Sequence, residues 1–355
     1  MQTRQLGTLW PVSALTLGGG GLGQLWGETT REEAVATVRA AVDAGITLFD
    51  MAPAYGRGEA ETVVAEAFEG KLPDGVRVTT KCQLGTPPAD KVAPELERRL
   101  VRSLETMRVE QADIFILHSN ICPDDYEYAQ HADTQHKWAT RFATYTDHVI
   151  PAMTSLVERG LIGAWGITGV GLPRTVMDAL RHDVKPSVVQ AVANLMDSPG
   201  DMRQYEEPPE PRNIIRTARN NDVGVLGIRA VQAGALTAAI DRDLADGHEQ
   251  MKDYAKAEPF RSLCRELGED PAVVAHRYAL GMEGVDSVIL GVKNRDELKQ
   301  LVDAEARGPL EEAVRERIDN LRLAFQKPRI PLEEFSLDDL KAMSGDGPDS
   351  KDTLH

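Results

Sequence analysis

Short apolar runs rich in β-branched residues alternate with amphipathic stretches along this chain, and no other feature limits its fold as strongly. Eight such runs can be distinguished, beginning near Ala14, Ile46, Val76, Asp113, Gly163, Ser187, Val223 and Ser287. Several of them are apolar throughout, which is typical of parallel strands that helices cover on both faces. Eight such strands joined by right-handed helical crossovers predict an α/β fold, the closed (β/α)8 TIM barrel, with a doubly wound open sheet as the alternative.

The stretches between the first strands have the sequence signals of helices. The pattern predicts helices over residues 34–44, 59–68, 94–107 and 151–159. Thr30 and Glu33 have the spacing of a capping box, in which each side chain bonds the backbone amide of the other residue. Gly45 and Gly70 stand where a residue with left-handed backbone geometry commonly ends a helix.

Three segments fall outside this repeat. Residues 4–10 and 12–17 flank Pro11 and predict an N-terminal β-hairpin that plugs the bottom of the barrel. Long connections follow strand 4 (residues 119–150) and strand 7 (residues 233–260), and long loops on a rigid scaffold are often functional. Because the first connection contains several aromatic residues, we expect it to be an ordered lid or pocket wall.

The length of the chain favours one domain. A barrel of ~250 residues with insertions accounts for residues 1–335 of the 355 as a single domain. The remaining tail, residues 336–355, is rich in Asp, Gly, Ser and Lys, and this composition predicts that it is mobile.

Charge and cysteine content narrow the expected partners and compartment. A net charge of −16 without a long basic run argues against nucleic acid and anionic membrane surfaces as partners. Cys82, Cys122 and Cys264 are too few and too scattered for a disulfide framework, which favours a reducing compartment. No apolar run approaches the ~20 residues of a membrane span, and the first residues lack a signal-peptide core. We therefore expect a cytoplasmic protein, and the His and Cys spacing within 122–136 predicts no metal site.

Four polar residues coincide with the ends of predicted strands. Asp50 ends the second run, Tyr55 follows it closely, Lys81 ends the third run and His118 ends the fourth. In a parallel barrel, catalytic residues lie at this end of the strands. A phenol titrates near pH ~10, but an adjacent ammonium group lowers that pKa and an imidazole can share the proton. We therefore expect Tyr55 to be a proton donor at neutral pH, with Asp50 holding Lys81.

The order, spacing and strand-end positions of these residues resemble the catalytic tetrad of the aldo-keto reductases, and the resemblance covers roughly residues 4–325. It implies an NADP(H)-dependent oxidoreductase that interconverts an alcohol and the carbonyl of an aldehyde, ketone or sugar, with NAD(H) the less expected cofactor. In such an enzyme a hydride passes between the nicotinamide and the carbonyl carbon. Tyr55 would exchange the proton, Lys81 would lower the Tyr55 pKa, and His118 would bond the carbonyl oxygen.

The same resemblance implies a set of cofactor contacts, which would be made by Gly20, Gly21, Thr168, Gln190, Arg229, Gly291, Lys293, Asn294 and Glu297. Gln190 would bond the nicotinamide carboxamide. Lys293 and Asn294 would hold the adenosine 2′-phosphate at a helix N-terminus, a favourable site for anions. The alternatives are a simple tight turn for the glycines, a buried structural amide for Gln190 and a solvated cap for the helix.

This sequence departs from the family pattern at several of these positions. Gly169 replaces an asparagine that would touch the nicotinamide, and Ile228 replaces a tyrosine that would stack on it. Leu301 replaces an asparagine that would contact adenine, which leaves Glu297 to make that contact alone. Arg229 is new, and could pair with the diphosphate, with an acidic substrate or with a structural partner. We expect Trp26 to line the mouth of the substrate pocket.

Two other functions remain open from the sequence. One is a cofactor-binding redox sensor or regulatory subunit with low turnover, although such a protein does not require all four residues of the tetrad. The other is a lyase or isomerase in which the Lys81 amine forms a Schiff base. The expected partner is a small-molecule carbonyl or alcohol, and no oligomeric state is predicted.

Overall fold

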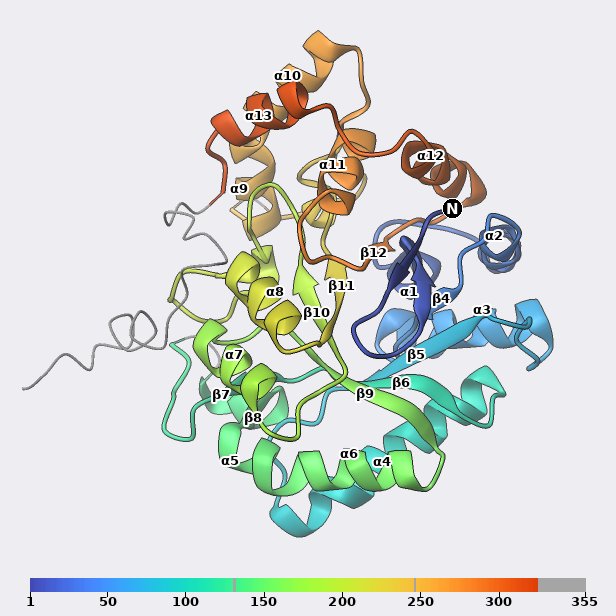
Figure 1. The fold of residues 1–355 in the computed structure, drawn as a ribbon, viewed down its shortest axis with the longest axis vertical. Coiled ribbons are helices and arrows are strands. Elements are labelled where there is room, and N and C mark those ends of the chain that lie inside the picture. The colour runs from blue at the N-terminus through green and yellow to red at the C-terminus, as the bar shows by residue number, and fades with distance from the viewer. Residues whose placement is uncertain (130–131, 246, 325–355) are drawn as a thin grey trace, which may run out of the picture. The chain divides into compact units, whose positions relative to one another are not determined.

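The computed structural model describes residues 1–129, 132–245 and 247–324, and within these residues it contains a closed barrel of eight parallel strands (Figure 1). The barrel strands are β3 (Leu15–Gly18), β4 (Leu48–Asp50), β5 (Arg77–Cys82), β6 (Ala112–Leu117), β9 (Ile162–Thr168), β10 (Val188–Val192), β11 (Gly224–Ile228) and β12 (Ser287–Leu290). Each of the eight predicted runs becomes one of these strands. The parallel pairing of β12 with β3 closes the sheet, which excludes the open-sheet alternative. The predicted mobile tail, 336–355, lies outside the described residues.

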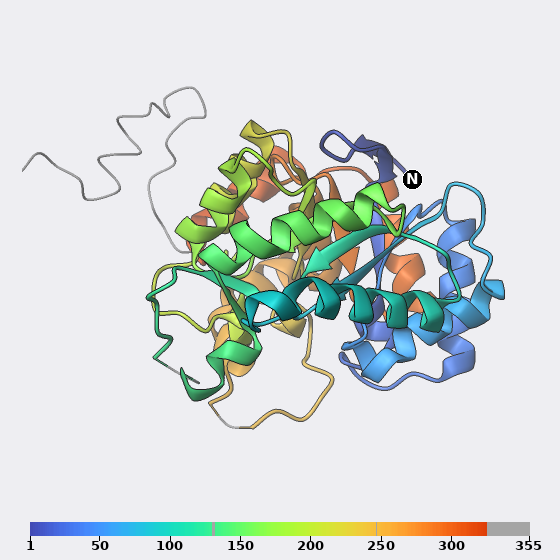
Figure 2. The ribbon, with the colours of Figure 1, turned by 90° about the horizontal axis from the view of Figure 1, so that it is seen from below.

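Helices surround the barrel and bury their apolar faces against it (Figure 2). Their bounds are α1 (Gly19–Leu22), α2 (Arg31–Asp43), α3 (Glu59–Phe68), α4 (Ala89–Met107), α5 (Phe142–Thr144), α6 (Ile150–Glu158), α7 (Pro173–Arg181), α8 (Pro211–Asn220), α9 (Glu249–Lys256), α10 (Glu258–Leu267), α11 (Pro271–Leu280), α12 (Arg295–Ala306) and α13 (Glu312–Asn320). Helix α4 begins five residues before the predicted start at Pro94, because a proline that lacks an amide hydrogen is tolerated near a helix start.

Only one of the two hydrogen bonds of the predicted capping box of α2 is formed. The Thr30 hydroxyl accepts a hydrogen bond from the Glu33 amide at 3.2 Å, as expected. The Glu33 carboxylate does not return to Thr30, because it binds the guanidinium and the backbone amide of Arg295 at the start of α12. The Glu33 side chain therefore joins two helices that are far apart in the sequence, in place of the local bond to Thr30.

The N-terminal hairpin is present and closes one end of the barrel. Strands β1 (Thr3–Gln5) and β2 (Pro11–Ser13) pair antiparallel. Leu6 and Val12 pack against interior residues of the barrel such as Leu48 and Ile114. In Figure 2 the hairpin lies at one end of the barrel, and the segment between β11 and α9 extends at the other end.

The long connection after β6 is ordered in its described residues, as expected. It contains the small parallel pair β7 (Asn120–Cys122) and β8 (Ala139–Arg141). Its aromatic rings pack on one another, with the centroids of Tyr128 and Trp138 4.6 Å apart. None of its described residues lines the main cavity, so the prediction of a pocket wall there was wrong. The predicted loop at 233–260 does line the cavity, although its second half forms α9 and the start of α10.

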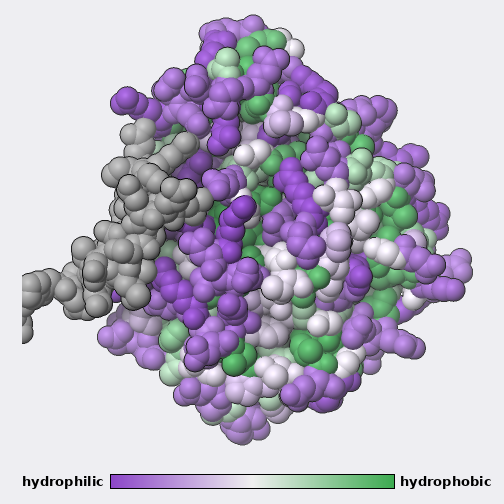
Figure 3. Space-filling view, viewed as in Figure 1, coloured by the Kyte–Doolittle hydropathy of each residue, from purple (hydrophilic) through white to green (hydrophobic). Residues whose placement is uncertain are grey.

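Few large apolar side chains are exposed on the surface of the described residues. Among the described residues, the larger apolar side chains that remain exposed are Met1, Leu25, Val101, Val184 and Met251. Figure 3 shows hydrophilic residues around most of the rim of one face, with neutral and hydrophobic residues through its centre and right side. No helix in the described part of the chain is long and apolar enough to cross a bilayer.

Candidate active site

The alternation of strand residues brings the predicted catalytic side chains together inside the barrel. Asp50 pairs in register with Thr79, two residues before Lys81, and β6 runs beside β5 and leads into His118. Tyr55 follows β4 at the start of a short 3₁₀ turn, Tyr55–Gly58. Because side chains alternate along a strand, Cys82 points to the opposite side of β5 from Lys81 and packs in the main hydrophobic core.

The Lys81 ammonium group is fully bonded. It donates to Asp50 Oδ2 at 2.7 Å, to the Met51 carbonyl oxygen at 3.0 Å and to Tyr55 Oη at 3.0 Å. An ammonium group has three N–H bonds, so each has an acceptor. Because the Tyr55 oxygen accepts from Lys81, its own O–H remains able to donate toward the cavity that Tyr55 lines.

Both oxygens of the Asp50 carboxylate accept hydrogen bonds. Its second oxygen, Oδ1, accepts from Thr79 Oγ1 at 2.7 Å and from Gln190 Nε2 at 2.6 Å. Gln190 therefore contributes an amide N–H to the tetrad, a contact that the sequence did not predict. With side-chain exposures of 1% for Lys81 and 2% for Asp50, this is a buried and satisfied ion pair.

Burial decides the protonation of the reacting groups. It raises the pKa of the Tyr55 phenol, and the opposing effect of Lys81 does not reverse that shift. The expected net lowering of the Tyr55 pKa was therefore wrong for this structure, but the phenol keeps its proton at neutral pH, as a donor must. Burial also lowers the pKa of His118 to about 4, so its imidazole is neutral at pH 7.

Buried neutral histidines should make stability depend on pH in a defined window. Burial lowers the pKa of His276, on α11, to about 4 from an ordinary value of 6.5. Between these values the unfolded chain binds a proton that the folded chain does not, so the free energy of unfolding falls as pH falls. The slope for one such group is about 1.4 kcal/mol per pH unit.

We expect the His276→Gln variant to lose that slope. Urea unfolding at pH 4.5, 5.5, 6.5 and 7.5 measures it, because the stability difference between wild type and variant should change between pH 6.5 and 4.5 and stay constant above. A difference that is the same at all four pH values would contradict a neutral buried His276.

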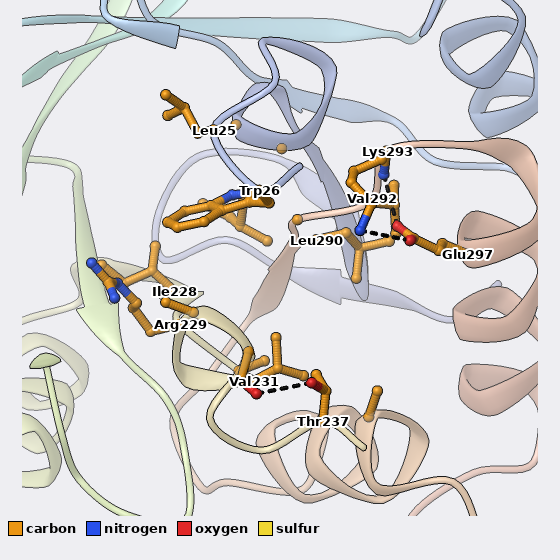
Figure 4. Close-up of a pocket in the computed structure, with 18 of the residues that line it drawn as sticks. Leu25, Trp26, Ile228, Arg229, Val231, Thr237, Leu290, Val292, Lys293 and Glu297 are labelled. Carbon is orange, nitrogen blue, oxygen red and sulfur yellow. Dashed lines mark hydrogen bonds and ion pairs between the residues drawn. The ribbon is translucent and has the colours of Figure 1, made fainter. Parts of the chain in front are cut away.

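One cavity of about 620 Å³ connects the tetrad with the ends of β11 and β12 and with α11 and α12. The predicted residues that line it are Asp50, Tyr55, His118, Gly20, Trp26, Thr168, Gln190, Arg229, Gly291, Lys293 and Glu297. In Figure 4, Trp26 lies between Arg229 on one side and Lys293 with Glu297 on the other. Lys81 lies behind this wall, where Asp50 and Tyr55 separate it from the cavity.

Two predicted cofactor residues do not line the cavity. A Cβ atom on Gly21 would lie 2.0 Å from the Val292 carbonyl oxygen, so the glycine is required by packing within the chain itself. Asn294 is the N-cap of α12, where its Oδ1 accepts from the Glu297 amide at 2.9 Å. This contact matches the alternative that the sequence left open, a helix cap.

The cation predicted for a 2′-phosphate, Lys293, already has carboxylate partners, and so does the nearby Arg295. Lys293 lies within ion-pair distance of Asp241, in the segment after β11, and 3.0 Å from Glu297. Arg295 pairs with Glu33 on the surface. The sequence could not show the Asp241 contact, because the two residues are 52 positions apart.

Arg229 is a largely buried ion-pair partner. Its side chain is 8% exposed and donates to Asp201 Oδ1 at 2.8 Å. The guanidinium carbon lies 5.7 Å from the centroid of Trp26, within the range of cation–π attraction. Arg242 approaches the same indole ring at 5.3 Å. Trp26 lines the cavity and is partly exposed.

Several lining residues had no signal in the sequence. Asp241 and Arg242 lie in a loop that was recognised only by its length, whereas Met202, His276 and Gln300 lie in segments that nothing marked as functional. Asn194 does not line the cavity, and its amide donates to the Arg229 carbonyl oxygen at 3.1 Å. It therefore supports the backbone at a residue with a φ of +61°.

Comparisons with known proteins agree with this geometry. The model of the aldo/keto reductase family matches residues 14–323. The chain is 24% identical over 307 residues to an L-galactose dehydrogenase of Arabidopsis thaliana, covering 86% of this chain and 88% of that protein. It is 25% identical over 329 residues to a pyridoxal 4-dehydrogenase of Microbacterium luteolum, covering 82% and 89%. A solved glycerol dehydrogenase of Gluconobacter oxydans is similar in fold, with a TM-score of 0.65 at 22% identity over 93% of this chain and 98% of that one.

Proposed function

The chain belongs to the aldo/keto reductase family and is an oxidoreductase of carbonyl and alcohol groups, and from this premise we propose that Tyr55 is its proton donor and NADP(H) its preferred hydride carrier. The observation that supports the proposal most directly is the 3.0 Å contact between Lys81 Nζ and Tyr55 Oη at the end of a cavity. The substrate is a small molecule with an aldehyde, ketone or sugar carbonyl, or the corresponding alcohol.

Each residue of the tetrad has its own role in the proposed proton transfer. In reduction Tyr55 donates its proton to the carbonyl oxygen, and Lys81 stabilises the phenolate that remains. Asp50 holds Lys81 in place through a 2.7 Å ion pair. Neutral His118 is a hydrogen-bond donor that orients the carbonyl oxygen. A bound nicotinamide would supply or accept the hydride.

The cavity residues fit a dinucleotide. The volume of about 620 Å³ lies in the range of ligand sites, and it extends from the tetrad to the first turn of α12. Gly20 and Gly291 present bare backbone to it, Gln190 and Thr168 offer polar groups near the tetrad, and Lys293 lies at the helix N-terminus. Arg229 is the cation between these ends.

NADP(H) preference rests on Lys293, which a 2′-phosphate must share with Asp241 and Glu297. We expect Lys293→Ala to weaken NADPH binding more than NADH binding. Asp241→Asn should strengthen NADPH binding relative to NADH, by up to about tenfold, because the variant removes a competing carboxylate. Fluorescence titration with each nucleotide measures both ratios.

A matched control is Lys299→Ala, on the exposed face of the same helix, where Lys299 pairs with Asp303. It should change neither ratio. Equal weakening of both nucleotides by Lys293→Ala would remove Lys293 from the 2′-phosphate site, and an unchanged ratio in Asp241→Asn would mean that the carboxylate does not compete.

The test of the whole proposal is nucleotide binding followed by turnover. Purified protein is titrated with NADPH and NADH and then assayed with a panel of aldehydes, ketones and sugars. Binding with carbonyl-dependent oxidation of the nucleotide would support it, whereas binding without turnover would favour the sensor alternative.

Lys81 has no free N–H and its pKa is raised by Asp50 and Tyr55 despite burial, which argues against a Schiff base. Trapping of a carbonyl on Lys81 by borohydride would reverse that conclusion.

A further inference from the structure

His276 has no role in the proton chemistry, yet it is a polar side chain in the wall of the cavity. It lies on α11 and is 4% exposed. Its neighbours along the wall are Ala272 on the same helix and Gln300 and Leu301 on α12, which packs against α11. An imidazole in a cavity wall can bond a ligand through a ring nitrogen that the protein itself leaves unbonded.

The backbone of α11 fixes which nitrogen carries the proton. Nδ1 lies 2.8 Å from the Ala272 carbonyl oxygen, one turn earlier in the helix. A carbonyl oxygen only accepts, so Nδ1 must be the donor. Since the imidazole is neutral at pH 7, Nε2 has a lone pair and is an acceptor. Within the described residues, no hydrogen bond to Nε2 is formed.

The surroundings of His276 indicate what kind of group it would meet. The cavity residues that α11 and α12 contribute around His276 are the small apolar Ala272, the larger apolar Leu301 and the polar Gln300, with the Asp270 carboxylate at the N-terminus of α11. Apolar walls with a few hydrogen-bonding groups suit a flat heteroaromatic ring. The ring must present an N–H donor to Nε2.

We propose that His276 accepts a hydrogen bond from the exocyclic amine of the cofactor's adenine and so selects adenine over bases that present a carbonyl oxygen there. This inference rests on the proposed function, since it takes the dinucleotide as the ligand. It also gives the chain a base contact in a site where Leu301 cannot form one. Lys293 and Glu297 line the same cavity as His276, and Figure 4 shows them close together.

The test uses NADH, NADPH and their hypoxanthine analogues, in which a carbonyl oxygen replaces the amine. Each is titrated into the full-length protein and binding is followed by nucleotide fluorescence, so that no turnover is needed. For the tighter of the two cofactors, wild type should bind the adenine form at least about tenfold more tightly, because two acceptors would face each other in the analogue. The His276→Phe variant should bind both forms equally.

A second variant keeps the test decisive if the His276→Phe protein does not fold. His276→Gln offers an amide that either donates or accepts, so it should bind both forms within about threefold. Equal binding of the two forms by wild type, or discrimination that persists in either variant, would overturn the role of His276 while leaving the proposed oxidoreductase function intact. Failure of wild type to bind any of the four nucleotides would overturn both proposals.

Discussion

Replacing Tyr55 with phenylalanine is expected to lower kcat for carbonyl reduction by about 10³-fold, because the variant has no proton to give to the developing alkoxide. The dissociation constant of the nicotinamide cofactor should change by less than about twofold. The ring remains in place, so the 4.5 Å contact between Lys81 Nζ and its centroid is retained. Stopped-flow single turnovers with a saturating aldehyde separate the hydride step from product release.

Tyr126→Phe is the matched control for this variant. The Tyr126 hydroxyl bonds Glu207 on the surface, outside the cavity. It should leave kcat and cofactor binding unchanged. If Tyr55→Phe retained kcat within about tenfold of wild type, Tyr55 would not be the proton donor and His118 would take its place as the leading candidate.

Lys81→Met is expected to abolish activity and also to destabilise the protein by roughly 3–5 kcal/mol, because it leaves a buried carboxylate without its cation. Asp50 would keep only the hydrogen bonds from Thr79 and Gln190. Urea unfolding at pH 7.5 measures the loss of stability. The size of the effect follows from burial, since the exposed ion pair of Lys299 with Asp303 contributes at most about 1 kcal/mol.

The double variant Asp50→Asn with Lys81→Met separates stability from catalysis. It removes both charges, so it should unfold at a higher urea concentration than Lys81→Met alone, while activity stays absent. If the double variant were less stable than the single one, the cost of Lys81→Met would lie in lost packing and not in an unpaired carboxylate.

The barrel and the tetrad could be predicted because they depend on local patterns. Continuous apolar runs define the strands, and a polar residue at the end of such a run, as at Asp50 and Lys81, has few structural explanations. Contacts made by the assembled fold could not be predicted in this way. The Gln190 bond to Asp50 joins strands 140 positions apart, and the partner of Lys293 comes from a loop with no regular pattern. The Tyr55 pKa depends on how far the ring is buried, which only the structure shows.

His276 illustrates a different limit of sequence reasoning. A histidine within a largely buried helix usually indicates a core residue whose polar atoms are bonded, and this holds for Nδ1, which is bonded to its own helix. Whether Nε2 is also bonded depends on which neighbours face the imidazole ring. Helix α12 contributes Leu301 to the same wall, and that proximity arises only when α11 and α12 pack together.

The hydrogen-bond partners of Asp50 and Lys81 all come from the barrel strands or from the turn directly after β4. Much of the cavity wall comes from the segment after β11, including Thr237, Asp241 and Arg242. Evolution can therefore alter one part without disturbing the other. Insertions or exchanges in residues 233–245 would change ligand contacts, among them the Asp241 pair with Lys293, at little risk to the proton chemistry. That segment is therefore the natural target for a directed-evolution library that alters nucleotide preference.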